Sequence, residues 1–170
     1  MTTYTPYLGR PHVVGVKSGV TNEAGGCDVM AYDAYLDGKT VQVVVVVLGQ
    51  RPNVAGRSFL AVAGHAALVL ASAIAKHLGV WHVAEVDHPV GAIGWPSRDV
   101  PVVATSPVAI VTLDGVPATT HVAVQPWGEN GIALHRVVAR LEVTSGAFRV
   151  ASDLVTAAVL SRPSLWQRLR

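Results

Sequence analysis

The N-terminal half of the chain carries β-branched runs that are separated by a turn signal. Residues 30–35 alternate weakly between apolar and polar positions, Asp37-Gly38 is a hairpin signal, and residues 39–48 are rich in valine. Within this run, residues 43–48 show no polar alternation at all. A strand that is apolar on both sides is typical of a sheet covered on both faces, so we expect residues 43–48 to be buried on both faces.

A helix is expected after this hairpin. Residues 50–57 contain Pro52 and Gly56 and predict a loop, and Ser58 is a suitable N-cap. Leucines at helical spacing and many alanines predict a helix over residues 59–78 that packs closely on the sheet. Gly79 is a natural residue to end it.

From residue 80 onward, short Val-rich runs alternate with turns that contain proline or glycine. Strands are expected at residues 81–86, 92–95, 102–113, 118–124, 133–143 and 148–154. Such spacing predicts a small antiparallel β domain. The sequence therefore predicts an α/β (α+β) chain, with an antiparallel sheet and a long helix in residues 1–79 and an all-β domain in residues 80–170.

Composition excludes several classes of protein. Hydrophobic residues make up 51% of the chain and charged residues 14%, which excludes a disordered chain. A formal charge of +2 is too small and too scattered for a nucleic-acid-binding surface. Arg162, Arg168 and Arg170 form a basic C-terminal tail, which we interpret as a solvated terminus, with a membrane-surface tail as the alternative.

The sequence gives no sign of export or of a disulfide. Cys27 is the single cysteine, so no intrachain disulfide can form. Residues 1–12 have no apolar core of a signal peptide and predict an irregular lead-in. The longest apolar stretch, residues 59–75, is interrupted by Gly64, His65 and Ser72 and is shorter than the ~20 residues of a membrane span, so we expect a soluble chain.

The candidate chemistry lies in the stretch GVKSGVT, residues 15–21. Lys17 supplies a fixed positive charge and Ser18 a hydroxyl group, while Gly19 has no Cβ and lets a ligand approach the backbone. A strand with these three features can bind a carboxylate and present backbone N–H groups to an extended ligand.

The order of motifs resembles the C-terminal portion of a serine-type D-alanyl-D-alanine carboxypeptidase, of the low-molecular-weight penicillin-binding protein class. The resemblance rests on GVKSGVTNEAGGCDVMAY, then DGKTVQVVVVVLGQ, then the long helix, and it covers about residues 4–78. It implies a partial penicillin-recognising sheet, and the tail at residues 163–166 resembles endings of actinobacterial relatives. For residues 80–170 the resemblance is one of architecture only.

The resemblance implies roles for five consecutive residues. Lys17 and Ser18 would be catalytic and would hold the terminal carboxylate of a stem peptide that ends in D-Ala-D-Ala. Gly19 would keep the floor of the site flat, and the backbone N–H of Val20 would be one of two oxyanion-hole donors. Thr21 matches the threonine that follows the triplet and completes the substrate-binding set. No metal and no organic cofactor is implied.

The chain departs from the family's pattern at the nucleophile. No serine is followed by a lysine three positions later, since Ser72 and Lys76 are four apart, and the Ser-x-Asn motif is also absent. We therefore expect a chain that is inactive alone. A truncated or misannotated reading frame, a processed chain whose partner supplies the rest, and a relic kept as a binding module all stay open.

In the complete protein, the implied function is hydrolysis of the terminal D-Ala of peptidoglycan through a serine acyl-enzyme. The expected partners are the stem peptide, β-lactams, and either a missing N-terminal half or a second copy of the chain, with no nucleic acid. The expected location is extracytoplasmic, by resemblance. The alternative is a non-catalytic cell-wall or protein-binding module built around the β domain.

Other motifs have plainer explanations. A phosphate-binding P-loop needs glycine before Lys-Ser, and Val16 occupies that position. Cys27 is expected to be a small core residue rather than a nucleophile. A zinc site at His82, Glu85 and His88 is disfavoured, because residue 85 points to the opposite face of a strand. The four tryptophans are expected to fill core or interdomain space, with a carbohydrate-stacking platform as the alternative.

Overall fold

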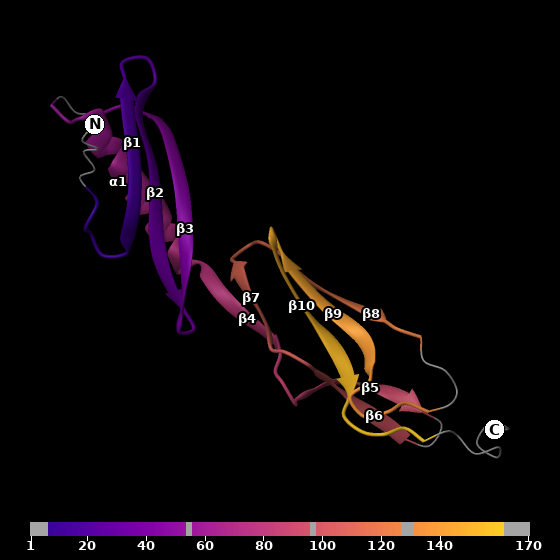
Figure 1. The fold of residues 1–170 in the computed structure, drawn as a ribbon. Coiled ribbons are helices and arrows are strands. Elements are labelled where there is room, and N and C mark those ends of the chain that lie inside the picture. Colours follow the sequence, from indigo (N-terminus) through magenta and orange to yellow (C-terminus); the bar gives the residue numbers. More distant parts are fainter. Residues whose placement is uncertain (1–6, 54–55, 96–97, 127–130, 162–170) are drawn as a thin grey trace. The chain divides into compact units, whose positions relative to one another are not determined.

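A computed structural model describes residues 7–53, 56–95, 98–126 and 131–161, as drawn in Figure 1. The described part of the chain contains antiparallel sheets and one α-helix, which confirms the predicted α+β class. It divides into two compact units, Met1–Leu78 and Gly79–Arg170. The basic tail and the tryptophans at 127 and 166 lie outside the described residues.

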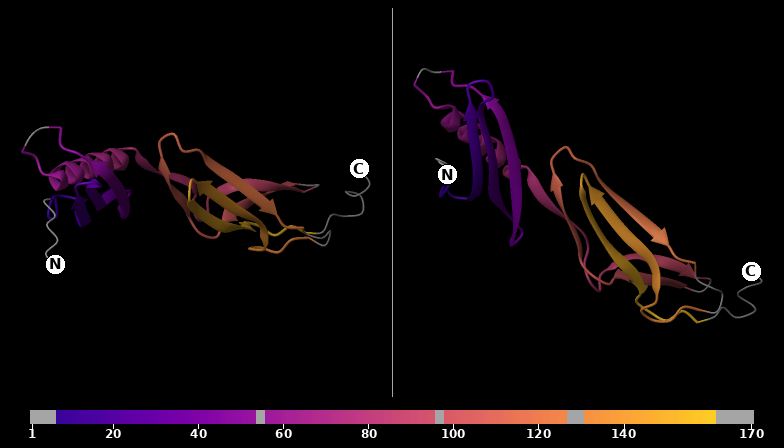
Figure 2. Two further views of the ribbon diagram at one scale, coloured as in Figure 1. Left: turned by 90° about the horizontal axis from the view of Figure 1, so that it is seen from above. Right: turned by 45° about the horizontal axis from the view of Figure 1, so that its top comes forward.

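The first unit is a three-stranded antiparallel sheet with one helix packed across it (Figure 1, Figure 2). The strands are β1 (Val13–Thr21), β2 (Gly25–Leu36) and β3 (Lys39–Gln50), in the order β1-β2-β3, and the helix is α1 (Phe59–Lys76). Asp37 and Gly38 join β2 to β3 with φ values of 53° and 73°. Positive φ at both central residues is the geometry of a type I′ hairpin turn, as the Asp-Gly signal predicts.

Small residues let α1 lie close to the sheet. Ala63, Gly64, Ala67 and Ala71 are its buried residues. Ala67 and Ala71 share a core cluster with Met30 of β2 and with Val43 and Val45 of β3. At Gly26 the contact is closest, since a Cβ built there would lie 2.2 Å from the backbone oxygen of Phe59. The first turn of α1 can therefore pack against β2 only because residue 26 has no side chain.

The prediction that residues 43–48 are buried on both faces is wrong. Val43 and Val45 are buried, but Val44 is 61% exposed, Val46 56% and Leu48 67%. Side chains alternate between the two faces of a strand, and within the described residues α1 covers only one face of this sheet. The other face of β3 carries Val44, Val46 and Leu48, and these side chains are in contact with solvent.

Helix α1 begins where the sequence predicts and ends slightly earlier. Ser58 is the N-cap, because its Oγ accepts a hydrogen bond from the backbone N–H of Ala61 at 3.0 Å. The helix ends at Lys76 with His77 as its C-cap, so the predicted end at residue 78 is wrong. Leu78 already begins strand β4 (Leu78–Ala84), and Gly79 lies within that strand rather than ending the helix.

By length and mean hydropathy, 1.7 over 18 residues, α1 also meets the criterion for a membrane-spanning helix. The core helix of a soluble protein meets the same criterion. One such helix is therefore weak evidence of a membrane span. Length and mean hydropathy do not support the expectation that residues 59–75 are too short and too interrupted to form one.

The second unit consists of strands. A five-stranded sheet has the order β5-β6-β10-β9-β8, and β4 pairs with β7 in a two-stranded sheet. The bounds are β5 (Pro89–Trp95), β6 (Arg98–Ala104), β7 (Val108–Leu113), β8 (Ala118–Val124), β9 (Val137–Ser145) and β10 (Phe148–Thr156). The single strand predicted at residues 102–113 is in fact two, because the chain turns at residues 105–107 between β6 and β7.

Buried valine, leucine and isoleucine side chains from several of these strands form one hydrophobic core cluster. Thr156 is fully buried beside it, and its hydroxyl donates a hydrogen bond to the carbonyl of Ala133 at 2.7 Å.

Candidate functional site

The Lys-Ser-Gly triplet lies on β1, at one edge of the three-stranded sheet. The register pairs Lys17 with Val29 and Ser18 with Asp28 on β2. Successive side chains of a strand point to opposite faces, so Lys17 belongs to the solvent-exposed face and Ser18 to the face that α1 covers. Both side chains can therefore reach one ligand only along the free edge of β1.

Lys17 is exposed, and its ammonium group lies over its own strand. Nζ donates a hydrogen bond to the carbonyl oxygen of Ser18 at 2.7 Å. Ser18 is half-buried. The pair thus places a cation next to the strand backbone, where an incoming carboxylate can replace the carbonyl as acceptor.

The residues that follow leave the backbone of β1 accessible. Gly19 pairs with Cys27, and a Cβ built at Gly19 would have no heavy atom within 4 Å. Val20 is exposed. Thr21 ends the strand, and its Oγ1 accepts a hydrogen bond from the backbone N–H of Ala24 at 2.9 Å, which stabilises the turn into β2. The five residues predicted from the sequence therefore form one continuous, open stretch.

Asp28 was not among the residues predicted for the site. It pairs with Ser18 on the α1-covered side of the sheet, and it is only 2% exposed. Burial raises the pKa of its carboxyl group above the ordinary value of 3.8, and Oδ2 has no hydrogen-bond partner among the residues that the structure describes. The alternation of the strand could have indicated its burial, because residues 26, 28 and 30 share one face of β2 and Asp28 lies between the other two.

Chemically, this arrangement offers a cation, a hydroxyl group and strand N–H groups to an extended ligand. An extended peptide ending in a carboxylate could lie along the free edge of β1 and find a cation on one side and a hydroxyl on the other. An acyl-enzyme also needs an activated serine. Ser72, the nearest approach to a Ser-x-x-Lys motif, lies on α1 and donates a hydrogen bond to the carbonyl of Val69 at 3.0 Å.

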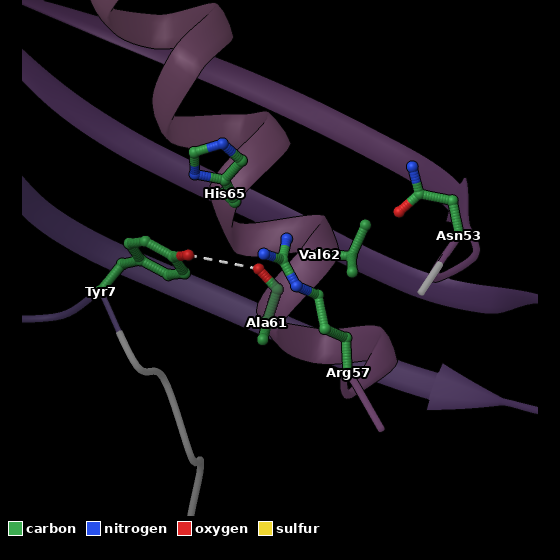
Figure 3. A pocket seen from close by; sticks show the side chains of 6 residues that line it. All are labelled: Tyr7, Asn53, Arg57, Ala61, Val62 and His65. Atoms are coloured by element: carbon green, nitrogen blue, oxygen red, sulfur yellow. Dashed lines mark hydrogen bonds between the residues drawn. The ribbon is translucent and has the colours of Figure 1, made fainter. Parts of the chain in front are cut away.

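Among the described residues of the first unit, two hollows stand out, and neither is lined by residues 17–21. The larger, about 580 Å³, is shown in Figure 3 and is lined by Tyr7, Asn53, Arg57, Ala61, Val62 and His65. In it, the hydroxyl of Tyr7 donates a hydrogen bond to the carbonyl of Ala61 at 3.2 Å. The smaller, about 230 Å³, lies beside His12, Tyr32 and Tyr35. None of these residues carries a role predicted from the sequence.

Two further candidates are the group His82, Glu85 and His88, and Cys27. His88 Nδ1 lies 3.7 Å from Glu85 Oε2, and both side chains are well exposed. Over the ranges that the structure describes, no group of three or more histidine, cysteine or acidic residues could hold a metal ion. Cys27 is half-buried, with Sγ 4.0 Å from the carbonyl of Ala24.

The comparisons with known proteins agree with a penicillin-binding protein fold. No protein family and no curated protein matches the sequence. Two of the solved structures that resemble it are each 16% identical to it. A D-alanyl-D-alanine carboxypeptidase, DacD, from Francisella tularensis has a TM-score of 0.53 over 91% of this chain. A peptidoglycan synthesis regulatory factor, PBP3, from Streptococcus pneumoniae has a TM-score of 0.50 over 89%.

The chain spans 38% of the length of the first protein and 44% of the second. Likeness at this identity establishes shared fold and not shared activity. The chain therefore has the fold of part of a penicillin-binding protein.

Proposed function

We propose that this chain supplies the carboxylate-binding strand of a peptidoglycan D-alanyl-D-alanine carboxypeptidase. In the complete protein, a stem peptide ending in D-Ala-D-Ala would lie along β1, and a serine acyl-enzyme would release the terminal D-Ala. The location would be extracytoplasmic. The observation that carries this proposal is the position of Lys17, Ser18 and Gly19 at an open sheet edge, in a chain that shares its fold with such a carboxypeptidase.

Each group has a chemical task in this proposal. Lys17 attracts the terminal carboxylate, and Ser18 donates a hydrogen bond to it from the other side of the strand. Gly19 has no Cβ, and a Cβ built there would meet no heavy atom within 4 Å. The space that a side chain would occupy is thus left for the peptide backbone. The backbone N–H of Val20 would stabilise the oxyanion that forms during acyl transfer, an effect of about 3–4 kcal/mol where it has been measured.

The chain by itself is proposed to bind and not to react. It lacks the Ser-x-x-Lys and Ser-x-Asn motifs, which supply the activated serine in this class of enzyme. Fluorescent penicillin is therefore expected to leave no covalent label on the purified chain. A stable adduct would show that a serine of this chain can act as nucleophile, and would refute this part of the proposal.

Binding is tested with diacetyl-L-Lys-D-Ala-D-Ala, followed by backbone NMR shifts. The amide signals of residues 17–21 are expected to move, and Lys17→Met is expected to weaken binding about tenfold, since it removes one charge-assisted hydrogen bond. Lys39→Met, on β3, is the matched control and should leave affinity unchanged. The same peptide ending in an amide should bind as weakly as Lys17→Met.

Two results would refute the binding role. One is equal affinity for the acid and the amide, and the other is shifts confined to residues 79–161. The second result would instead favour the non-catalytic binding module in the β domain.

A further inference from the structure

The carboxyl group of Asp28 lies directly behind the strand that is proposed to bind a carboxylate. In the antiparallel register, Asp28 of β2 is opposite Ser18 of β1 and Val47 of β3. Residues that are directly opposite in an antiparallel pair share one face of the sheet, with Cβ atoms about 4.5–5.5 Å apart. The side chains of Ser18 and Asp28 are therefore neighbours on the face that α1 covers.

This carboxyl group is already buried within the chain. Asp28 is 2% exposed, and its Oδ2 has no hydrogen-bond partner among the described residues. Buried polar atoms are almost always hydrogen-bonded, so an unpaired one needs an explanation. The described neighbours of Asp28 in the sheet are Gly26 and Met30 along β2, Val47 on β3 and Ser18 on β1. Of these four side-chain positions, Ser18 alone offers a group that can form a hydrogen bond.

The charged and titratable groups on the elements packed around Asp28 lie elsewhere. On β1, β3 and α1 these groups are Lys17, Lys39, His65 and Lys76. Lys17 belongs to the opposite face of the sheet, Lys39 is at the other end of β3, and both α1 side chains are exposed. Tyr7, which packs beside α1, uses its hydroxyl on the carbonyl of Ala61. Burial raises the pKa of Asp28, which favours its neutral form.

The protonation state of Asp28 decides what its neighbour can donate. A serine hydroxyl has one proton to donate, an ionised carboxylate can only accept, and a neutral carboxyl group has one O–H donor of its own. An ionised Asp28 would compete with a ligand for the proton of Ser18. A neutral Asp28 can instead donate to Ser18 Oγ, which leaves the serine proton for a carboxylate at the free edge of β1.

We propose that Asp28 is a positioning residue for carboxylate binding, which in its neutral form donates a hydrogen bond to Ser18 and directs the serine hydroxyl toward the ligand. In its ionised form it withdraws that hydroxyl and repels the negative charge of the ligand. This inference rests on the proposed function, because it names the group that controls Ser18 in the same site. Since the ligand prefers the neutral form, binding of the ligand must in turn favour uptake of a proton by Asp28.

The test is the pH dependence with which the full 170-residue chain binds diacetyl-L-Lys-D-Ala-D-Ala. The carboxyl group of the peptide is ionised above about pH 5, so a change of affinity above that pH comes from the protein. Wild-type affinity is expected to fall about tenfold as pH rises through the folded-state pKa of Asp28. Binding near that pKa is expected to take up protons, which calorimetry in buffers of different ionisation enthalpy measures.

Asp28→Asn separates positioning from packing. Its amide can still donate to Ser18 and cannot ionise, so affinity should stay within about twofold over the same pH range, without proton uptake. Asp33→Asn is the matched control, because Asp33 lies further along β2 and on the opposite face, and it should keep the wild-type pH profile. A loss of packing alone would weaken binding equally at every pH. Circular dichroism and thermal unfolding verify that the variants are folded.

The outcomes distinguish this inference from the proposed function. Peptide binding with the same pH profile in the wild type and in Asp28→Asn would overturn the role of Asp28 and leave the proposed function intact. Binding to the wild type without proton uptake, or a pH profile that Asp33→Asn abolishes, would do the same. If the peptide bound at no pH, the proposed function would be refuted, and the role of Asp28 in it would be refuted as well.

Discussion

Gly26→Ala tests how the sheet and helix of the first unit fit together. A Cβ at residue 26 would lie 2.2 Å from the backbone oxygen of Phe59, 2.7 Å from its carbonyl carbon and 3.2 Å from Cβ of Ala63. The first two atoms belong to the backbone of α1, so no side-chain rotation can relieve the contact. The start of the helix or the strand must move by about 1 Å, since carbon and oxygen need roughly 3 Å or more of separation.

Overpacking of this kind costs about 1–3 kcal/mol, and the backbone contact places Gly26→Ala toward the upper end, at 2 kcal/mol or more. For a unit of this size, the melting temperature of the first unit should fall by roughly 8–16 °C. Thermal unfolding followed by the helical far-UV circular dichroism signal measures this unit selectively, because α1 is the one helix of the described residues.

Gly19→Ala is the matched control, because no heavy atom lies within 4 Å of the added Cβ. It should be neutral or stabilise the fold by about 0.4–1 kcal/mol through the unfolded chain. Under the proposed function it should still weaken peptide binding. If Gly26→Ala melted within about 2 °C of the wild type, the close approach of α1 to β2 would be refuted.

Three further predictions concern single contacts. Burial raises the pKa of Asp28, so the folded state binds a proton more tightly than the unfolded state does. The free energy of unfolding of the first unit should therefore fall as pH rises from about 4 through the folded-state pKa. Urea unfolding measures this fall, and the Asp28→Asn variant should not show it. A wild-type stability that rises over the same pH range, with Asp28→Asn removing the rise, would contradict this sign. Ser58→Ala removes the N-cap of α1 and should lower the free energy of unfolding of the first unit by about 0.5–2 kcal/mol, and Ser58→Asp should restore most of this loss. Equal stability of the wild type and both variants would argue against the cap. Thr156→Val removes the hydroxyl donor to the carbonyl of Ala133 and should lower the free energy of unfolding of the second unit alone by about 1–3 kcal/mol. Amide hydrogen exchange measures this loss, and Thr156→Ser should lose less. Loss of exchange protection in α1 would show that the two units do not unfold independently.

The sequence by itself determined the local structure and the candidate site. Turn chemistry placed the Asp37-Gly38 hairpin, the Ser58 cap placed the start of α1, and strand alternation with Pro and Gly turns gave most of the β strands. The Lys17-Ser18-Gly19 motif is local as well, because the order of residues along one strand fixes which side chains are neighbours. These features depend on interactions between residues a few positions apart.

Only the tertiary structure decided burial. The valine run at residues 43–48 is the same whether a sheet is covered on one face or on two, so its composition could not reveal that Val44, Val46 and Leu48 meet solvent. Asp28 became a buried carboxyl group for the same reason, because α1 lies over its side of β2 and leaves Val29 on the open side. Burial depends on what packs against a residue from a distant part of the chain, and no local pattern contains that information.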